Sequence, residues 1–388
     1  MKFEYYNNIS EINSLTNNIK HVIKKKERNS SFEILRIILM TLIVLHHIFI
    51  NTTSLDKLNN DNYKSLISWR YILLKIISNY GQFGNNAFIM ISGYFSISKT
   101  NFNVNKFFNF LLEIYTYYYP SIYIGKKLSQ KYRKINFPNY FNYYIYFPIL
   151  TSNGNWFIQV YLILLIFSPF INTGLLSLDK KNYKTLVILI IIFYCILCPV
   201  TNYYNFYSNI FSYTNFIKLL LPYIIGGYIR IYDLKYKYLW KIIGKYYFIL
   251  TISFEIIFDI LAINFENFNF ILFNSYLTFN INSFISIIGS MGIIFLFKNI
   301  DFYNKKLNWI AVSVLGIYLI HGNKNISPYI YNVFFPTNNI NDSYFFIKYI
   351  IKGFIIISLS IIIDLIRRYT IGLIFKKLLD KLLNNYIK

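Results

Sequence analysis

The chain is dominated by successive apolar runs, each about as long as a bilayer's hydrocarbon core is thick. A helix needs about 20 apolar residues to cross about 30 Å of hydrocarbon. Only 14% of the 388 residues are charged, against about 25% in an average soluble protein. These features predict an all-α fold, a polytopic membrane helix bundle. We place about ten transmembrane helices, at residues 33–51, 71–97, 106–125, 155–172, 184–200, 216–232, 242–263, 281–298, 309–333 and 346–375.

Positive charge gathers in alternate loops between these runs. If the N-terminus is inside, the inside loops include the basic segments 230–241 and 298–306, whereas the outside loop 201–215 has no charge. The positive-inside rule then predicts a multi-pass membrane protein with both termini cytoplasmic. One loop disagrees, because residues 125–134 carry five positive charges on the outside. Either this segment folds back as an external helix, or the third and fourth spans are misplaced.

Composition predicts one membrane domain, at residues 33–376, between a polar, basic cytoplasmic segment at 1–32 and a basic cytoplasmic tail at 377–388. The net charge of +23 does not indicate nucleic-acid binding, because the basic residues lie between apolar runs and form no aromatic-basic motif. Cys195 and Cys198 lack a second cysteine pair or a nearby histidine, so we interpret them as packing residues. We predict no metal site.

Two polar side chains, Arg36 and His47, lie inside the first apolar run. Such groups cost several kcal/mol in a membrane unless function or a partner offsets the cost. Eleven residues make about three helical turns, so the two share a helix face about 16 Å apart along the axis, while His46 points about 100° away. Glu33 lies one turn before Arg36 and can pair with it. The spacing predicts a binding charge near one membrane surface and a general base about halfway across. Alternatively, Glu33 and Arg36 anchor the helix at the interface, and His47 bonds a neighbouring helix.

Other polar residues interrupt later apolar runs. Ser92 and Tyr94 flank Gly93, and this SGY turn indicates either a site or close helix packing. His321 ends the segment LGIYLIH and is either structural or part of a site. Trp156 is first interpreted as an interfacial aromatic anchor, with a wall of a substrate site as the alternative.

Several carboxylates also lie in apolar runs, where they are usually paired or hydrated. Glu255 and Asp259 stand one turn apart, whereas Glu113 and Asp364 stand alone. The segment GQFGNN at 81–86 interrupts the second run, and we expect either a broken helix or a helix entered through a loop. Non-helical backbone at that depth has to be buried in protein or line a wet cavity.

Taken in order, these segments resemble the acyltransferase 3 family of bacterial integral-membrane acyltransferases, from about residue 30 to 330. The pieces that carry the resemblance are FEILRIILMTLIVLHH, GNNAFIMISGYF, NWFIQVYLILLIFSPFIN, LPYIIGGYIR and VSVLGIYLIH. The family has a ten-helix core and an essential arginine and histidine separated by ten residues. The resemblance implies that Arg36 helps bind acyl-CoA from the cytoplasmic side and that His47 activates an acceptor hydroxyl. Glu33 stands where the family usually has an aspartate counterion.

The resemblance further implies O-acyltransfer, with acetyl expected, to a hydroxyl of a cell-surface or lipid-linked polysaccharide. Acyl-CoA is then a co-substrate rather than a tightly bound cofactor. The expected partners are acyl-CoA, the glycan acceptor, the lipid bilayer and envelope-glycan assembly proteins. The residues expected to bind substrate are Ser92, Tyr94, Trp156 and His321.

Two other functions remain open from the sequence. The first is a transporter or flippase of polysaccharide or acyl groups, with Glu255, Asp259 and His321 as a proton relay. The second is a non-catalytic component of an envelope-assembly complex.

Overall fold

The computed structural model describes residues 29–52, 69–132, 156–197, 215–264, 283–334 and 344–375, together with 377 and 381. All regular structure in these ranges is helical, which confirms the all-α prediction. The elements are α2 (Ser30–Thr52), α4 (Trp69–Ser96), α5 (Val104–Lys131), α7 (Trp156–Leu176), α8 (Lys180–Ile190), the π-helix η3 (Ile191–Leu197), α10 (Asn215–Tyr232), α11 (Lys237–Asn264), α13 (Phe284–Lys298), α14 (Lys305–Ala311), α15 (Val314–His321), α16 (Ser327–Tyr329), the π-helix η4 (Ile330–Phe334) and α17 (Phe345–Tyr369).

Among the described residues, three helices are long and apolar enough to cross a membrane: Ser30–Asn51, Trp156–Leu176 and Phe345–Tyr369. The apolar helix α13 is shorter. The predicted span at 309–333 is divided among α14, α15, α16 and η4. The figure of about ten spans therefore stays a prediction.

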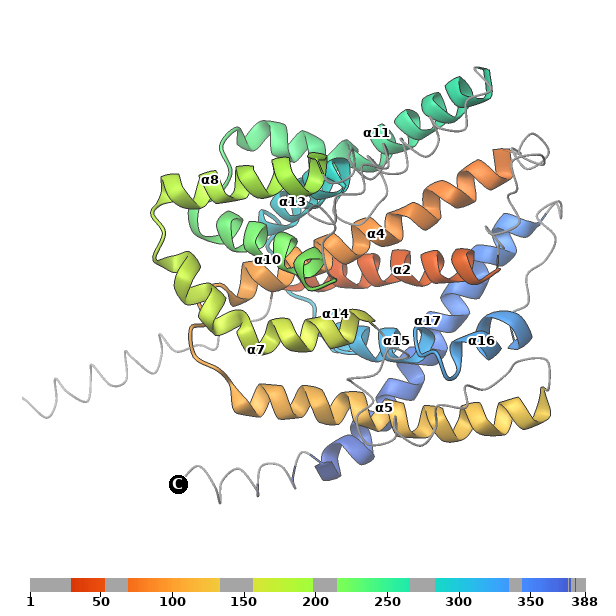
Figure 1. Ribbon diagram of the computed structural model, residues 1–388. Coiled ribbons are helices and arrows are strands. Elements are labelled where there is room, and N and C mark those ends of the chain that lie inside the picture. Colours follow the sequence, from red (N-terminus) through yellow and green to blue (C-terminus); the bar gives the residue numbers. More distant parts are fainter. Residues whose placement is uncertain are drawn as a thin grey trace, which may run out of the picture.

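Helices α2 and α4 lie side by side at the centre of the bundle (Figure 1). In this view α8, α11 and α13 lie above them, while α5, α7 and α15 lie below. Helix α17 crosses obliquely and contacts both α2 and α15. Buried apolar side chains form two clusters, and α2 contributes Leu39 to one and Leu45 to the other. Because α2 is buried on two faces, its polar residues are held between neighbouring helices.

The GQFGNN segment does not break α4, so the predicted interruption is wrong. Its glycines instead allow α4 to pack closely against α2. A Cβ on Gly81 would lie 2.2 Å from the Cβ of His46, and one on Gly84 would lie 3.0 Å from the carbonyl oxygen of Leu39. Small residues serve this purpose in membrane helices, where close packing drives association.

Helices α4 and α10 cross at backbone contact. A Cβ on Gly93 would lie 2.0 Å from the carbonyl oxygen of Tyr223, and one on Gly226 would lie 2.1 Å from that of Met90. The glycine of the SGY turn therefore serves packing, as the alternative interpretation expects. The same crossing brings the next residue, Tyr94, to the end of the bundle where α10 also ends.

Asn172 of the SPFIN segment joins α7 to this crossing. Its buried amide donates to the carbonyl oxygens of Ser96 and Lys99, at 2.7 and 2.8 Å, and accepts from the hydroxyl of Tyr223 at 2.9 Å. Carbonyls at a helix C-terminus lack intrahelical partners. Asn172 donates to the last residue of α4, Ser96, and to Lys99 just beyond it, and so fixes the end of α4.

The basic segment 125–134 belongs largely to a helix, because α5 runs on through Lys131. The continuation of this segment, 133–155, lies outside the described residues. Cys195 is buried in η3, in keeping with a packing role, and Cys198 lies outside the described residues.

The glycine crossing generates a matched prediction. Replacing Gly226 by alanine places a Cβ against the Met90 backbone, which cannot move without separating α4 from α10. We expect a loss of about 1–3 kcal/mol of stability, measured as a lower thermal unfolding midpoint in detergent. At Gly174 of α7 an added Cβ meets nothing within 4 Å. Gly174→Ala should raise stability by up to about 1 kcal/mol through helix propensity. Equal midpoints for the two variants would contradict the packing account.

Candidate active site

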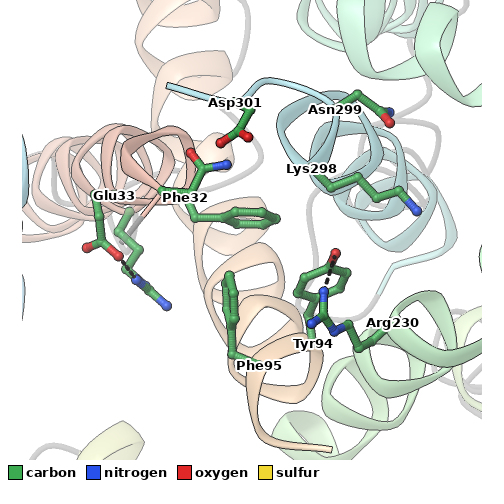
Figure 2. Close-up of a pocket in the computed structure, with 10 residues that line it drawn as sticks. Phe32, Glu33, Tyr94, Phe95, Arg230, Lys298, Asn299 and Asp301 are labelled. Carbon is green, nitrogen blue, oxygen red and sulfur yellow. Dashed lines mark hydrogen bonds and ion pairs between the residues drawn. The ribbon is translucent and has the colours of Figure 1, made fainter. Parts of the chain in front are cut away.

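A cavity of about 540 Å³ opens where one end of α2 meets the ends of α4, α10 and α13 (Figure 2). The first turns of α2 face the last turns of the other three helices there. The lining residues are Asn29, Phe32, Glu33, Arg36, Tyr94, Phe95, Arg230, Lys298, Asn299 and Asp301. The cavity thus joins residues that are more than 200 positions apart in sequence.

Three cations line the cavity, Arg36, Arg230 and Lys298, against the two carboxylates Glu33 and Asp301. Arg36 pairs with Glu33 on α2, so the predicted intrahelical ion pair is present. The carboxylate of Glu33 is almost fully buried, whereas the Arg36 side chain keeps 20% exposure toward the cavity. The side chains that line the cavity therefore carry a net positive formal charge.

Aromatic rings hold the two guanidinium groups in place. Arg36 lies over Phe95, 5.5 Å from the ring centre. Arg230 lies over Tyr94 at 5.0 Å and donates a 3.2 Å hydrogen bond to its hydroxyl. Phe32 stacks on Tyr94 with ring centres 5.3 Å apart. Figure 2 shows Tyr94 below Lys298, with Phe32 and Phe95 beside it, and the ring of Phe95 stands edge-on to the other two. Guanidinium groups favour aromatic faces because the planar cation stacks on the ring.

Lys298 forms an ion pair with Asp233, which lies in the turn between α10 and α11 and outside the cavity lining. Their ammonium and carboxylate groups lie 2.5 Å apart. Burial alone would raise the pKa of Asp233, but the hydrogen bond and charge of Lys298 and the backbone N–H of Leu234 lower it below its usual value. Asp233 is therefore ionised at neutral pH and holds Lys298 at the rim of the cavity.

His47 lies near the other end of α2, beside α15. Its ring centre is 5.0 Å from that of His321 and 6.4 Å from that of Tyr318. The neighbouring His46 faces α4 instead, with its Nε2 3.4 Å from the amide nitrogen of Gln82. The two adjacent histidines therefore have different surroundings, as the helical angle predicts.

His321 is fully buried at the end of α15. Its Nδ1 lies 2.5 Å from the carbonyl oxygen of Ile317, and its Nε2 has no hydrogen-bond partner among the described residues. The hydroxyl of Tyr331 donates to the backbone carbonyl of His321 at 3.3 Å. The backbone around this imidazole is thus fixed, while one ring nitrogen remains available.

The other predicted site residues divide between the cavity and the packing. Tyr94 lines the cavity, whereas the hydroxyl of Ser92 donates to the Phe88 carbonyl of its own helix at 3.2 Å. Trp156 packs on Phe157 with ring centres 5.9 Å apart. Trp156 and Ser92 are not among the cavity-lining residues.

Sequence reasoning missed the residues that complete the cavity. Arg230 ends LPYIIGGYIR, and its place in a segment that carries the family resemblance was the available signal. Phe95, Lys298 and Asp301 gave no signal of their own, because loop lysines and membrane aromatics are abundant throughout this chain.

Glu113 and Asp364 are not isolated, contrary to expectation. The fully buried Asp364 lies 2.8 Å from Arg367 and 3.0 Å from Arg368, and it accepts a hydrogen bond from the Tyr117 hydroxyl. Glu113 also pairs with Arg367, at 2.8 Å. Two carboxylates thus balance two guanidinium groups in what we call the α5–α17 ion cluster.

The α5–α17 ion cluster also holds α15. Arg368 donates to the hydroxyl of Ser313, just before α15 begins, at 2.9 Å. A Cβ on Gly316 would lie 2.9 Å from the Asp364 carboxylate, so α15 rests directly on the cluster. The side chains of Glu255 and Asp259, expected in a proton relay, lie outside the described residues. Within the described part of the chain, no group of three or more His, Cys, Asp or Glu residues could hold a metal ion.

We predict that Asp364→Asn destabilises the protein more than Glu113→Gln does. Asp364 contacts both arginines, so losing its charge leaves buried positive charge poorly compensated, at a cost of about 3–5 kcal/mol. Among the described residues Glu113 forms an ion pair with Arg367 alone, and it is partly exposed, which makes it the matched control. Thermal unfolding in detergent measures both, and equal losses would contradict the central place of Asp364.

Comparison with known proteins identifies a family for this chain. A family model described as an acyltransferase domain, that of the acyltransferase 3 family, matches residues 29–365. No curated protein and no solved structure matches the chain. The matched residues include the cavity lining, His47 and His321, and nearly the whole helical bundle. The chain therefore belongs to the acyltransferase 3 family of membrane acyltransferases.

Proposed function

We propose that the protein is a membrane O-acyltransferase that moves an acyl group, acetyl in our proposal, from acyl-CoA to a hydroxyl of a cell-surface or lipid-linked polysaccharide. One observation carries this proposal. A single helix, α2, contributes Glu33 and Arg36 to a cationic cavity at one end and His47 to a pair of facing histidines near the other. A donor that reaches both places has to be long, charged at one end and reactive at the other.

The cavity suits the nucleotide end of acyl-CoA. Arg36 and Arg230 offer planar donors that match phosphate oxygens, and charge-assisted bonds of this kind are strong. Lys298 adds a point charge at the rim. The rings of Phe32 and Phe95 supply flat apolar surface for a purine. A free acetate or a neutral acyl donor would leave this combination of charge and aromatic surface unused.

The length of α2 suits the rest of the donor. Arg36 and His47 are about 16 Å apart along the helix axis. In acyl-CoA, the pantetheine arm separates the phosphates from the thioester. With its phosphates on Arg36, an arm extended along α2 brings the thioester toward His47.

The chemistry needs a base near the thioester. In our proposal His47 removes the proton from the acceptor hydroxyl while the oxygen attacks the thioester carbonyl carbon. The carbon–sulfur bond then breaks, and the proton passes from His47 to the CoA sulfur. Histidine suits this work because its ordinary pKa lies near physiological pH.

The same arrangement supports a location for the protein. We propose the bacterial cytoplasmic membrane, with several membrane passes and both termini in the cytoplasm, so that the cavity opens toward cytoplasmic acyl-CoA. Acceptor glycan then approaches the histidines from the opposite side. Envelope-glycan assembly proteins are the proposed protein partners, and no tightly bound cofactor is required.

His47→Ala should abolish acyl transfer by removing the base, a loss of about 100-fold or more. His46→Ala is the matched control. Because His46 faces α4, this variant should lose much less activity than His47→Ala. The measurement is turnover of labelled acetyl-CoA by purified protein in nanodiscs, with thermal unfolding to confirm that both variants fold. Equal loss in two folded variants would overturn the assignment of His47.

Arg230→Gln and Arg36→Lys should raise the KM for acetyl-CoA about tenfold, because neither replacement offers the fork of a guanidinium to phosphate. The control is a substrate: acetyl-pantetheine lacks the nucleotide, so its KM should be the same in wild type and variants. If the KM for acetyl-CoA is unchanged in both variants, the cavity is not the nucleotide site.

A further inference from the structure

We infer that His321 is a positioning residue: its Nε2 accepts a hydrogen bond from the ring N–H of His47 and so fixes which nitrogen of His47 acts as the base. The inference rests on the proposed acyl transfer for its chemical consequence. Its structural basis lies in the hydrogen bonding and burial of His321.

The tautomer of His321 follows from its Nδ1 contact. The carbonyl oxygen of Ile317, 2.5 Å away, can only accept a hydrogen bond, so Nδ1 carries the proton. In the neutral ring, Nε2 is then a bare acceptor. His321 is fully buried, and burying an acceptor without a partner costs desolvation free energy. A partner that donates to Nε2 recovers that free energy.

The surroundings of His321 point to His47 as that donor. The ring of Tyr318 stands edge-on to His321 at 87° and 5.8 Å between ring centres. The Tyr331 hydroxyl already bonds the His321 backbone carbonyl. His47 is the remaining described ring carrying an N–H in contact, with ring centres 5.0 Å apart and planes 43° apart. A hydrogen bond between two imidazole nitrogens needs ring centres at about this separation.

His47 is free to make this bond. Its backbone carbonyl accepts from Asn51 at 2.7 Å, but within the described residues no hydrogen bond holds its ring nitrogens. A rotation of the His47 ring aligns one N–H with Nε2 of His321. His321 itself cannot turn as readily, because its Nδ1 bond and the α5–α17 ion cluster beneath α15 fix its position.

The consequence is a defined proton path. With one nitrogen of His47 donating to His321, the other is the lone pair that takes the hydroxyl proton. His47 becomes an imidazolium whose two N–H groups point to His321 and to the reacting atoms. The proton gained from the hydroxyl then goes to the CoA sulfur as the thioester bond breaks, and His321 stays neutral throughout. Misdirecting a catalytic histidine's tautomer lowers turnover strongly in hydrolases with a similar arrangement.

The test uses a property that does not require activity. The chain has four histidines, so ¹⁵N-histidine labelling with single substitutions assigns the ring signals of His47 by solid-state NMR. We expect one fixed, hydrogen-bonded tautomer of His47 in the wild type and in His321→Gln, whose amide oxygen also accepts. In His321→Leu the two tautomers should both be populated. An unchanged His47 spectrum in His321→Leu overturns the inference.

Turnover of labelled acetyl-CoA is the second readout. In His321→Leu, kcat should fall about 100-fold or more with an unchanged KM for acetyl-CoA, while His321→Gln keeps a large share of kcat. Equal kcat in the two variants indicates that His321 only fills space, which contradicts the inference. One further outcome separates the two claims. If the wild type shows a single hydrogen-bonded tautomer of His47 that is lost in His321→Leu, but has no thioester turnover, the hydrogen bond is supported and the proposed function is contradicted.

Discussion

The close crossing of α4 and α10 is the contact on which the candidate donor site depends. Gly93 and Gly226 let the two backbones touch, and close packing is what holds helices together in a lipid solvent. Tyr94 follows Gly93 directly, and Arg230 comes one turn after Gly226. The crossing therefore delivers the aromatic ring and the guanidinium that bond each other in the cavity. Any residue larger than glycine at either position separates this pair.

Helix α2 links the cavity beside the α4–α10 crossing to the histidine pair His47 and His321. It packs against α4 through Gly81 and Gly84, and against α15 and α17 through its later turns. The cationic cavity and the facing histidines are thereby held at a spacing determined by helix rise alone. In the proposed reaction this spacing matches a donor whose charged and reactive ends are far apart. The α5–α17 ion cluster supports the histidine pair, because α15 rests on Asp364.

Local patterns predicted the helical bundle, the Glu33–Arg36 pair and the different surroundings of His46 and His47, because each depends on helical periodicity. Patterns failed where tertiary contact decided the outcome. The glycines of GQFGNN, expected to interrupt a helix, allow close packing with α2. Glu113 and Asp364, expected to stand alone, meet partners on two helices far apart in sequence. Arg230 and Lys298 were missed because only the packed fold brings them to Arg36.

The most direct test of the account is a structure of the protein in nanodiscs with a non-hydrolysable acetyl-CoA analogue bound, determined by cryo-electron microscopy. The account predicts phosphate density beside Arg36 and Arg230, a pantetheine arm running along α2, and the acyl group next to His47 and His321. An analogue that binds elsewhere would contradict it. So would an analogue seated in the cavity with its acyl end directed away from the histidines.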